Sequence, residues 1–128
     1  MAKKDAIMLE IKTDDRICHL VEALNTLDGI RTFSSCGGHE NPGLGQIPAG
    51  EFDINMDVEP TEAGFYSLSI IRSAMYMHPE HESLMLQVWL CGVEPDVIAF
   101  SLWGCNKADP GILSELILNT AVRHGREF

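Results

Sequence analysis

A chain of 128 residues has the length of one ordinary domain, and we expect a single domain over residues 1–128. Apolar residues make up 45% of the chain and charged residues 22%, which excludes the disordered, collagen-like and coiled-coil classes. The 19 acidic and 9 basic residues give a formal net charge of −10, which disfavours nucleic acid and anionic lipid as partners because an acidic surface repels phosphate groups.

The apolar stretches are short, and the sequence shows neither a secretion signal nor a membrane-spanning segment. We therefore expect a cytoplasmic protein with no membrane partner. Small secreted domains have dense cysteine patterns, whereas the cysteines of this chain are widely spaced. We expect reduced thiols at all four of them, which are Cys18, Cys36, Cys91 and Cys105.

The first part of the chain predicts a strand, a helix and a second strand. Alternation of apolar and polar residues indicates a strand at residues 6–12. Residues 14–28 follow with helical spacing, acidic residues at the start and Gly29 as a left-handed stop, and residues 30–33 form a short strand. The inward face of the helix consists of Ile17, Leu20, Val21, Leu24 and Leu27.

Residues 37–50 contain five glycines and two prolines and predict a long loop. Residues 52–58 then alternate strictly between apolar and polar types, which indicates a strand with one wet face. Thr61 is placed to cap a helix that ends near Met77, before His78 and a proline. We expect its inward stripe to contain Phe65, Leu68, Ile71 and Met75.

Two apolar runs, at residues 84–91 and 97–103, predict a hairpin because the segment between them is short. Asp109 as cap and Pro110 as the first residue predict a last helix that stops at Gly125. Its expected inward residues are Ile112, Leu113, Leu116, Ile117 and Ala121.

The predicted order of elements is strand, helix, strand, strand, helix, strand, strand, helix. The first six follow the ferredoxin-like βαββαβ pattern, with a hairpin strand and a C-terminal helix added. We expect an α+β fold in which helices pack on a mainly antiparallel sheet.

The segment after the second predicted strand is the candidate site. Its glycines leave backbone amides free to converge on an anion or a substrate oxygen, which would also favour a thiolate at Cys36, with His39 as a base or ion-pair partner. In the alternative the same residues build a tight turn, and Cys36 packs as a small apolar side chain. Beside Cys36 and His39 as catalytic candidates, the ligand-binding candidates are Thr32, Ser34, Ser35, Gly37, Gly38 and Glu40.

A second interpretation is a zinc site. Cys36 and His39, and likewise His78 and His81, stand three positions apart, and four such groups satisfy tetrahedral coordination. In the alternative the two histidines near residue 80 are solvated members of a polar turn.

A third interpretation concerns the tryptophans. Trp89 and Trp103 fall on one face of the predicted hairpin, with Met85, Ala99 and Ser101 and the more distant Cys91. Because both faces of the hairpin are apolar, each needs a cover, which the last helix, a planar ligand or a second copy of the chain would supply. A homodimer is the expected partner arrangement.

Residues 32–39 resemble a stretch of the wybutosine-synthesis methyltransferase family, which acts on transfer RNA in archaea and eukaryotes. That stretch has the pattern Thr-x-Ser-Ser-Cys-x-Gly-Arg, and the preceding helix also lies where the family has one, so the resemblance covers about the first third of the chain. His39 replaces the arginine, as in small uncharacterised bacterial proteins with a Ser-Cys-x-Gly-His stretch. The residues that match are Thr32, Ser34, Ser35, Cys36 and Gly38.

The resemblance implies a related fold and loop, and a nucleotide-like ligand such as S-adenosylmethionine. Our first hypothesis is a small-ligand-binding domain, with or without enzymatic activity, whose site is the segment 32–40. The alternatives are a homodimeric interaction module without catalysis and a zinc-dependent enzyme.

Overall fold

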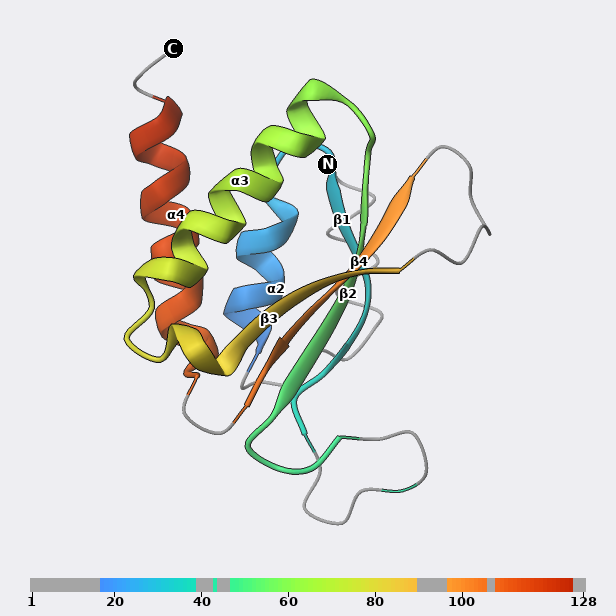
Figure 1. Ribbon diagram of the computed structural model, residues 1–128, viewed down its shortest axis with the longest axis vertical. Helices are drawn as coiled ribbons and strands as arrows, with labels where there is room; N and C mark the ends of the chain where they lie inside the picture. Colours follow the sequence, from blue (N-terminus) through green and yellow to red (C-terminus); the bar gives the residue numbers. More distant parts are fainter. Residues whose placement is uncertain (1–16, 39–42, 44–46, 90–96, 106–107, 126–128) are drawn as a thin grey trace.

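The computed structural model describes residues 17–38, 43, 47–89, 97–105 and 108–125. The strand predicted at residues 6–12 and the start of the helix predicted from residue 14 lie outside this part. Within it the elements are α2 (Cys18–Asn25), β1 (Ile30–Cys36), β2 (Phe52–Val58), α3 (Glu62–Met77), the 3-10 turn η1 (His81–Ser83), β3 (Leu84–Trp89), β4 (Ile98–Gly104) and α4 (Pro110–Gly125) (Figure 1).

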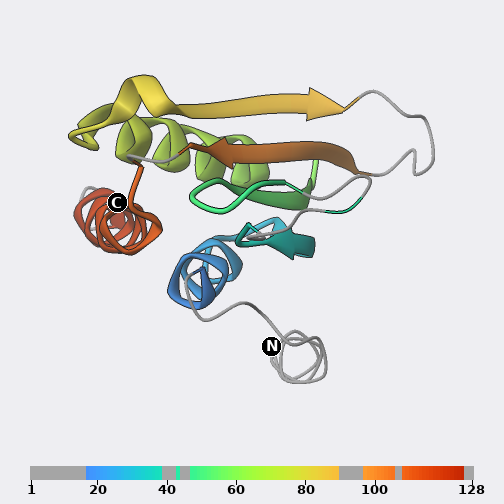
Figure 2. The same cartoon turned by 90° about the horizontal axis from the view of Figure 1, so that it is seen from below.

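The four strands form one antiparallel sheet in the order β1-β2-β4-β3, which is visible from edge to edge in Figure 2. The pairing of β3 with β4 confirms the predicted hairpin, and the fold is α+β as expected. A ferredoxin-like sheet places the first strand of the chain between its third and fourth strands. Here β4 holds that place, between β2 and β3.

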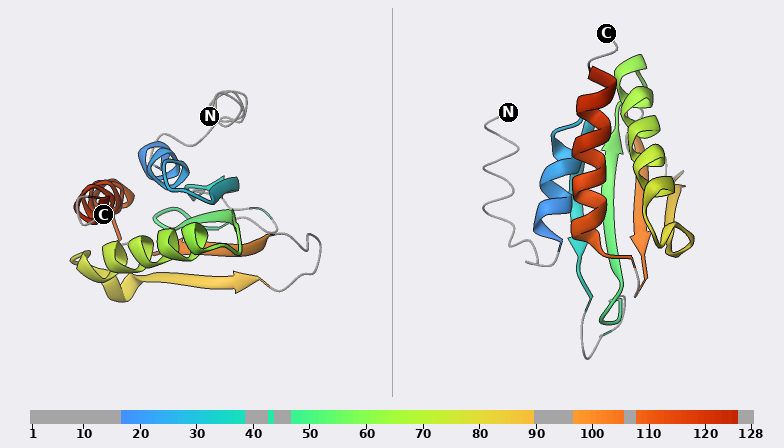
Figure 3. Two further views of the ribbon diagram at one scale, coloured as in Figure 1. Left: turned by 90° about the horizontal axis from the view of Figure 1, so that it is seen from above. Right: turned by 90° about the vertical axis from the view of Figure 1, so that its left-hand side faces the viewer.

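The helices α2, α3 and α4 lie together on one face of the sheet, with α4 in contact with both of the others (Figure 3). The main core fills the space between this helical layer and the sheet, because every second residue of β2 points toward the helices. No helix in the described ranges is long and apolar enough to span a bilayer. The largest core side chains with no exposed surface include Phe52, Ile54, Met56, Leu20, Leu24, Ile71, Leu102, Leu113 and Ile117.

Local sequence explains where the helices begin. Thr61 Oγ1 accepts a hydrogen bond from the Gly64 amide (3.2 Å) at the start of α3, and Asp109 Oδ1 accepts one from the Gly111 amide (2.8 Å) at the start of α4. Both predicted caps are confirmed. The predicted inward face of α2 is also confirmed, since its members are at most 5% exposed; they are Ile17, Leu20, Val21, Leu24 and Leu27.

The predicted inward faces of α3 and α4 are wrong in part. Phe65 is 52% exposed and Ile112 is 39% exposed. In α3 the buried positions are Gly64, Ser67, Ile70, Ile71 and Ala74, a face with several small residues. Small side chains allow close approach of neighbouring backbone, which a stripe of large apolar residues would prevent.

Candidate functional site

The segment expected to be a loop after residue 33 continues as strand β1 through Cys36. Ser34, Ser35 and Cys36 pair with Asn55, Ile54 and Asp53 of β2. The register shifts between Thr32 and Ser34, so a β-bulge at Phe33 adds one residue to the edge strand.

This pairing divides the predicted site between the two faces of the sheet. Thr32 is held on the side of the helices, where its Oγ1 accepts from Asn25 Nδ2 (2.7 Å) and its amide donates to Asn25 Oδ1 (3.0 Å). Ser35 pairs with the buried core residue Ile54, so it shares the helix side. Ser34 and Cys36 are the members that lie on the opposite face.

Gly38, the second of the two glycines after Cys36, fits against the chain that returns to β2. Gly38 has a φ of +94°, and a Cβ there would lie 2.6 Å from the carbonyl oxygen of Pro48 and 2.8 Å from that of Glu51. Only glycine fits this close approach. The sequence analysis predicted that the Gly37 amide is open to a ligand, but Gly37 is buried. His39 and Glu40 lie outside the described residues.

The face opposite the helices has a network of polar side chains from neighbouring strands. Ser101 Oγ donates to Asp53 Oδ1 (2.6 Å), and Asn55 Nδ2 donates to Ser34 Oγ (2.8 Å). Trp103 Nε1 donates to Glu51 Oε1 (3.0 Å), just before β2 begins. We call the group Ser34, Cys36, Glu51, Asp53, Asn55, Ser101 and Trp103 the sheet-face site.

Most residues of this site lie in two rows that run across the sheet. In one row Cys36, Asp53, Trp103 and Met85 are neighbours across the four strands. In the next row the neighbours are Ser34, Asn55, Ser101 and Gln87. Side chains directly opposite on one face of an antiparallel pair have Cβ atoms about 5 Å apart. The sheet therefore brings Cys36 beside Asp53, and Asp53 beside Trp103.

Hydrogen-bond acceptors predominate at the site. The Nδ2, Oγ and Nε1 donors of Asn55, Ser101 and Trp103 are used within the network, as described above. Asn55 Oδ1 is buried without a hydrogen-bond partner in the described structure, which costs about 1–3 kcal/mol for a neutral group. The arrangement suits a ligand that supplies donors or positive charge.

The described cysteines are Cys18, Cys36 and Cys105; all three are partly exposed, and none is joined in a disulfide within the described structure. That these thiols are reduced stays a prediction, and Cys91 lies outside the described residues. Cys36 presents its thiol beside carboxylate and hydroxyl groups.

The predicted zinc ligands within the described residues, which are Cys36, His78 and His81, are not brought together. His78 is 1% exposed, its Nδ1 accepts from the Glu80 amide (2.9 Å), and its Nε2 is 3.0 Å from the Asp109 carbonyl oxygen. Because Nδ1 accepts a hydrogen bond, the neutral ring has its proton on Nε2, and Nε2–H donates a hydrogen bond to the carbonyl oxygen of Asp109. Both nitrogens are thus used to join the end of α3 to the start of α4.

The position of His78 also separates it from Cys36. His78 belongs to the helical layer, whereas Cys36 lies on the other face of the sheet. His81 is exposed and stacks on Tyr76 with ring centroids 5.6 Å apart. In the part of the chain that the structure describes, no group of three or more His, Cys, Asp or Glu residues is placed to hold a metal ion.

Sequence reasoning omitted Glu51, Asp53, Asn55 and Ser101 from the ligand-binding candidates. The alternation at residues 52–58 predicted a solvent-facing side for β2, but it did not identify the strands on either side of β2. The β1–β2 and β2–β4 registers supply this information. The β1–β2 register is what connects Cys36 with Asp53.

Searches of protein-family models, of curated proteins and of solved structures found no match to this chain.

Proposed function

We propose that this chain is a small-ligand-binding domain, and that the ligand binds at the sheet-face site. The observation that supports the proposal most directly is the row Cys36, Asp53, Trp103, in which a thiol, a carboxylate and an indole from three strands are neighbours. Hydrogen bonds from Ser101 and Trp103 hold Asp53 and Glu51 in place. A site whose side chains are already fixed loses less entropy when it binds.

The chemistry of the site favours a cationic ligand with a planar ring. Asp53 and Glu51 attract positive charge, Asn55 Oδ1 lacks a donor, and the indole of Trp103 is partly exposed. Arg31, which lies on the same face, is paired with Asp57 (2.9 Å) and does not neutralise Asp53.

S-Adenosylmethionine, the ligand implied by the resemblance at residues 32–38, has these properties. Its sulfonium and ammonium groups are positively charged, and its adenine combines a planar ring with an amino donor. We propose it as the first ligand to test. In this proposal Ser34 and Cys36 contact the ligand, and Thr32 and Ser35 support the site from the helix side.

A matched pair of carboxylate variants tests the proposal. Asp53→Asn removes the charge at the site, whereas Asp57→Asn removes the same charge four residues along the same face of β2. We expect S-adenosylmethionine at about 1 mM to raise the melting temperature of the wild type and of Asp57→Asn, but not of Asp53→Asn. The absence of stabilisation in the wild type, or an equal response in both variants, would contradict the proposal.

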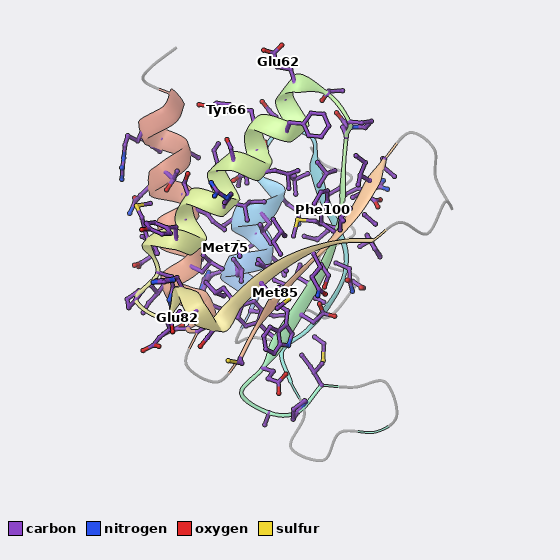
Figure 4. The ribbon with its side chains drawn as sticks, in the orientation of Figure 1. Glu62, Tyr66, Met75, Glu82, Met85 and Phe100 are labelled. Atoms are coloured by element: carbon purple, nitrogen blue, oxygen red, sulfur yellow. The ribbon has the colours of Figure 1, made fainter. Side chains whose placement is uncertain are left out.

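A second candidate function is homodimerisation through the same face. Met85, labelled in Figure 4, is 45% exposed and is the neighbour of Trp103. The described helices α2, α3 and α4 lie on the opposite face of the sheet (Figure 3). Sedimentation at increasing concentration separates the two functions. A dimer that Met85→Glu dissociates supports this candidate, and a clean monomer at all concentrations eliminates it.

We propose that the sheet is ferredoxin-like in strand order, with β4 in the place of the first strand. The order β1-β2-β4-β3 and the antiparallel pairing of all neighbours support this proposal.

A further inference from the structure

The helical side of the molecule contains a groove with a different charge from the sheet-face site. It lies along α3 and α4, has a volume of about 610 Å³, and is lined by Arg72, Tyr76 and His81 on one side and by Thr120 and Arg123 on the other. Met75, which also lines it, marks the relevant stretch of α3 in Figure 4. No carboxylate is among the described residues that line this groove.

The concentration of positive charge in the groove is unusual for this chain. The formal net charge is −10, and the lysines and arginines within the described residues are Arg31, Arg72 and Arg123. Arg31 is paired with Asp57 on the sheet. The other two lie in the groove, and within the described part of the chain neither has an ion-pair partner.

A second, independent feature of the groove is a polar atom without a partner. Thr120 is 1% exposed, and its Oγ1 is buried with no hydrogen bond in the described structure. A threonine in a helix commonly bonds to the carbonyl oxygen one turn earlier, so an unpartnered hydroxyl at this position is unusual. A ligand oxygen, or a water molecule that a ligand holds, would supply the missing partner.

The exposed rings of Tyr76 and His81 indicate which further group a negatively charged ligand of this groove contains. Tyr76 is 77% exposed, and its ring stacks on His81 at an interplanar angle of 30°. An apolar or aromatic group lying against this pair would reduce its contact with water.

We infer that the α3–α4 groove binds a phosphate monoester with an aromatic or apolar substituent, through Arg72, Arg123 and Thr120. Guanidinium groups bind phosphate oxygens in bidentate geometry, and two of them match the charge of a dianion. This site is separate from the sheet-face site and does not depend on the proposed function.

Nuclear magnetic resonance titration with phenyl phosphate at constant ionic strength tests the inference, with phenol as the uncharged comparison. We expect saturable shifts at residues of the groove with phenyl phosphate only. Arg72→Gln and Arg123→Gln should each raise the dissociation constant at least tenfold, whereas Arg31→Gln should leave it unchanged. Arg72 and Arg123 are exposed and glutamine is a good helix former, so we expect both variants to fold. A comparison of their spectra with that of the wild type checks this.

Thr120→Val provides a further arm, because it removes the hydroxyl at nearly constant volume. We expect it to weaken phenyl phosphate binding severalfold without lowering the melting temperature, since no hydrogen bond is lost. Shifts that do not saturate, that phenol reproduces, or that Arg31→Gln reduces as much as Arg72→Gln would overturn the inference.

Discussion

The two sides of this molecule use their polar groups in different ways. On the helical side, buried polar groups such as His78 and Ser67 make hydrogen bonds that join one element to another. On the sheet side, Asp53, Ser101 and Trp103 make bonds that hold partly exposed groups in fixed positions. The difference separates buried residues that stabilise the fold from the residues of the sheet-face site, and we expect substitutions at His78 and at Ser101 to differ in how much stability they remove.

The largest expected effect lies on the helical side, at Gly64. A Cβ at this position would lie 1.9 Å from the carbonyl oxygen of Glu59 and 3.3 Å from the side chain of Val58. The clash involves backbone, so α3 must move, and we expect Gly64→Ala to lower the free energy of unfolding by about 3 kcal/mol or more. Urea unfolding followed by circular dichroism measures the loss.

Gly111→Ala is the control for this substitution. It also replaces a helical glycine, but its Cβ would meet only Asp109 Oδ1 at 3.2 Å. We expect a change of less than about 1 kcal/mol, in the stabilising direction, because alanine favours helix over glycine. Similar losses in the two variants would show that the close approach of α3 to residue 59 is not what requires glycine.

The second prediction concerns His78, which joins α3 to α4. His78→Leu puts an apolar side chain of similar size in place of the imidazole and removes both hydrogen bonds. The Glu80 amide and the Asp109 carbonyl then lack this partner. We expect a loss of about 2–3 kcal/mol in the free energy of unfolding. His81→Ala, at an exposed position, should cost less than about 0.5 kcal/mol.

An added test of His78 uses metal. If this residue has only the structural role described, addition of zinc should not stabilise the wild type more than His78→Leu. A selective stabilisation of the wild type would restore the zinc interpretation.

Sequence patterns predicted most of the elements because the determinants are local. The caps at Thr61 and Asp109 and the alternation of β2 each depend on a few neighbouring residues. The inward face of α3 could not be found in this way, because small residues such as Gly64 and Ala74 are buried only by virtue of what packs against them. Phe65 has the stronger apolar character, yet it is 52% exposed.

The candidate site was predicted only in part for a related reason. Cys36 and Ser34 were identified from their small, polar neighbours, but their partners Asp53 and Asn55 are distant in sequence and are connected by register alone. The bulge at Phe33 reverses which of the later residues face the helices, and nothing in the local pattern marks it. His78 was expected to be either a zinc ligand or a solvated residue of a polar turn, whereas its burial depends on contact with the start of α4.

The smallest expected effect lies on the sheet side. Ser101→Ala removes the hydrogen bond to Asp53 Oδ1, but Asp53 is partly exposed and water can replace the hydroxyl, so we expect a loss of only about 1 kcal/mol in the free energy of unfolding. If Ser101 fixes Asp53 for a ligand, the same substitution should also weaken S-adenosylmethionine binding severalfold, as measured by calorimetry. Ser69→Ala serves as the control, because Ser69 is exposed and bonds only to the carbonyl oxygen of Tyr66 in its own helix. A loss of stability at Ser101 as large as that at His78, with binding unchanged, would mean that the sheet-side network supports the fold in the same way as the helical side does.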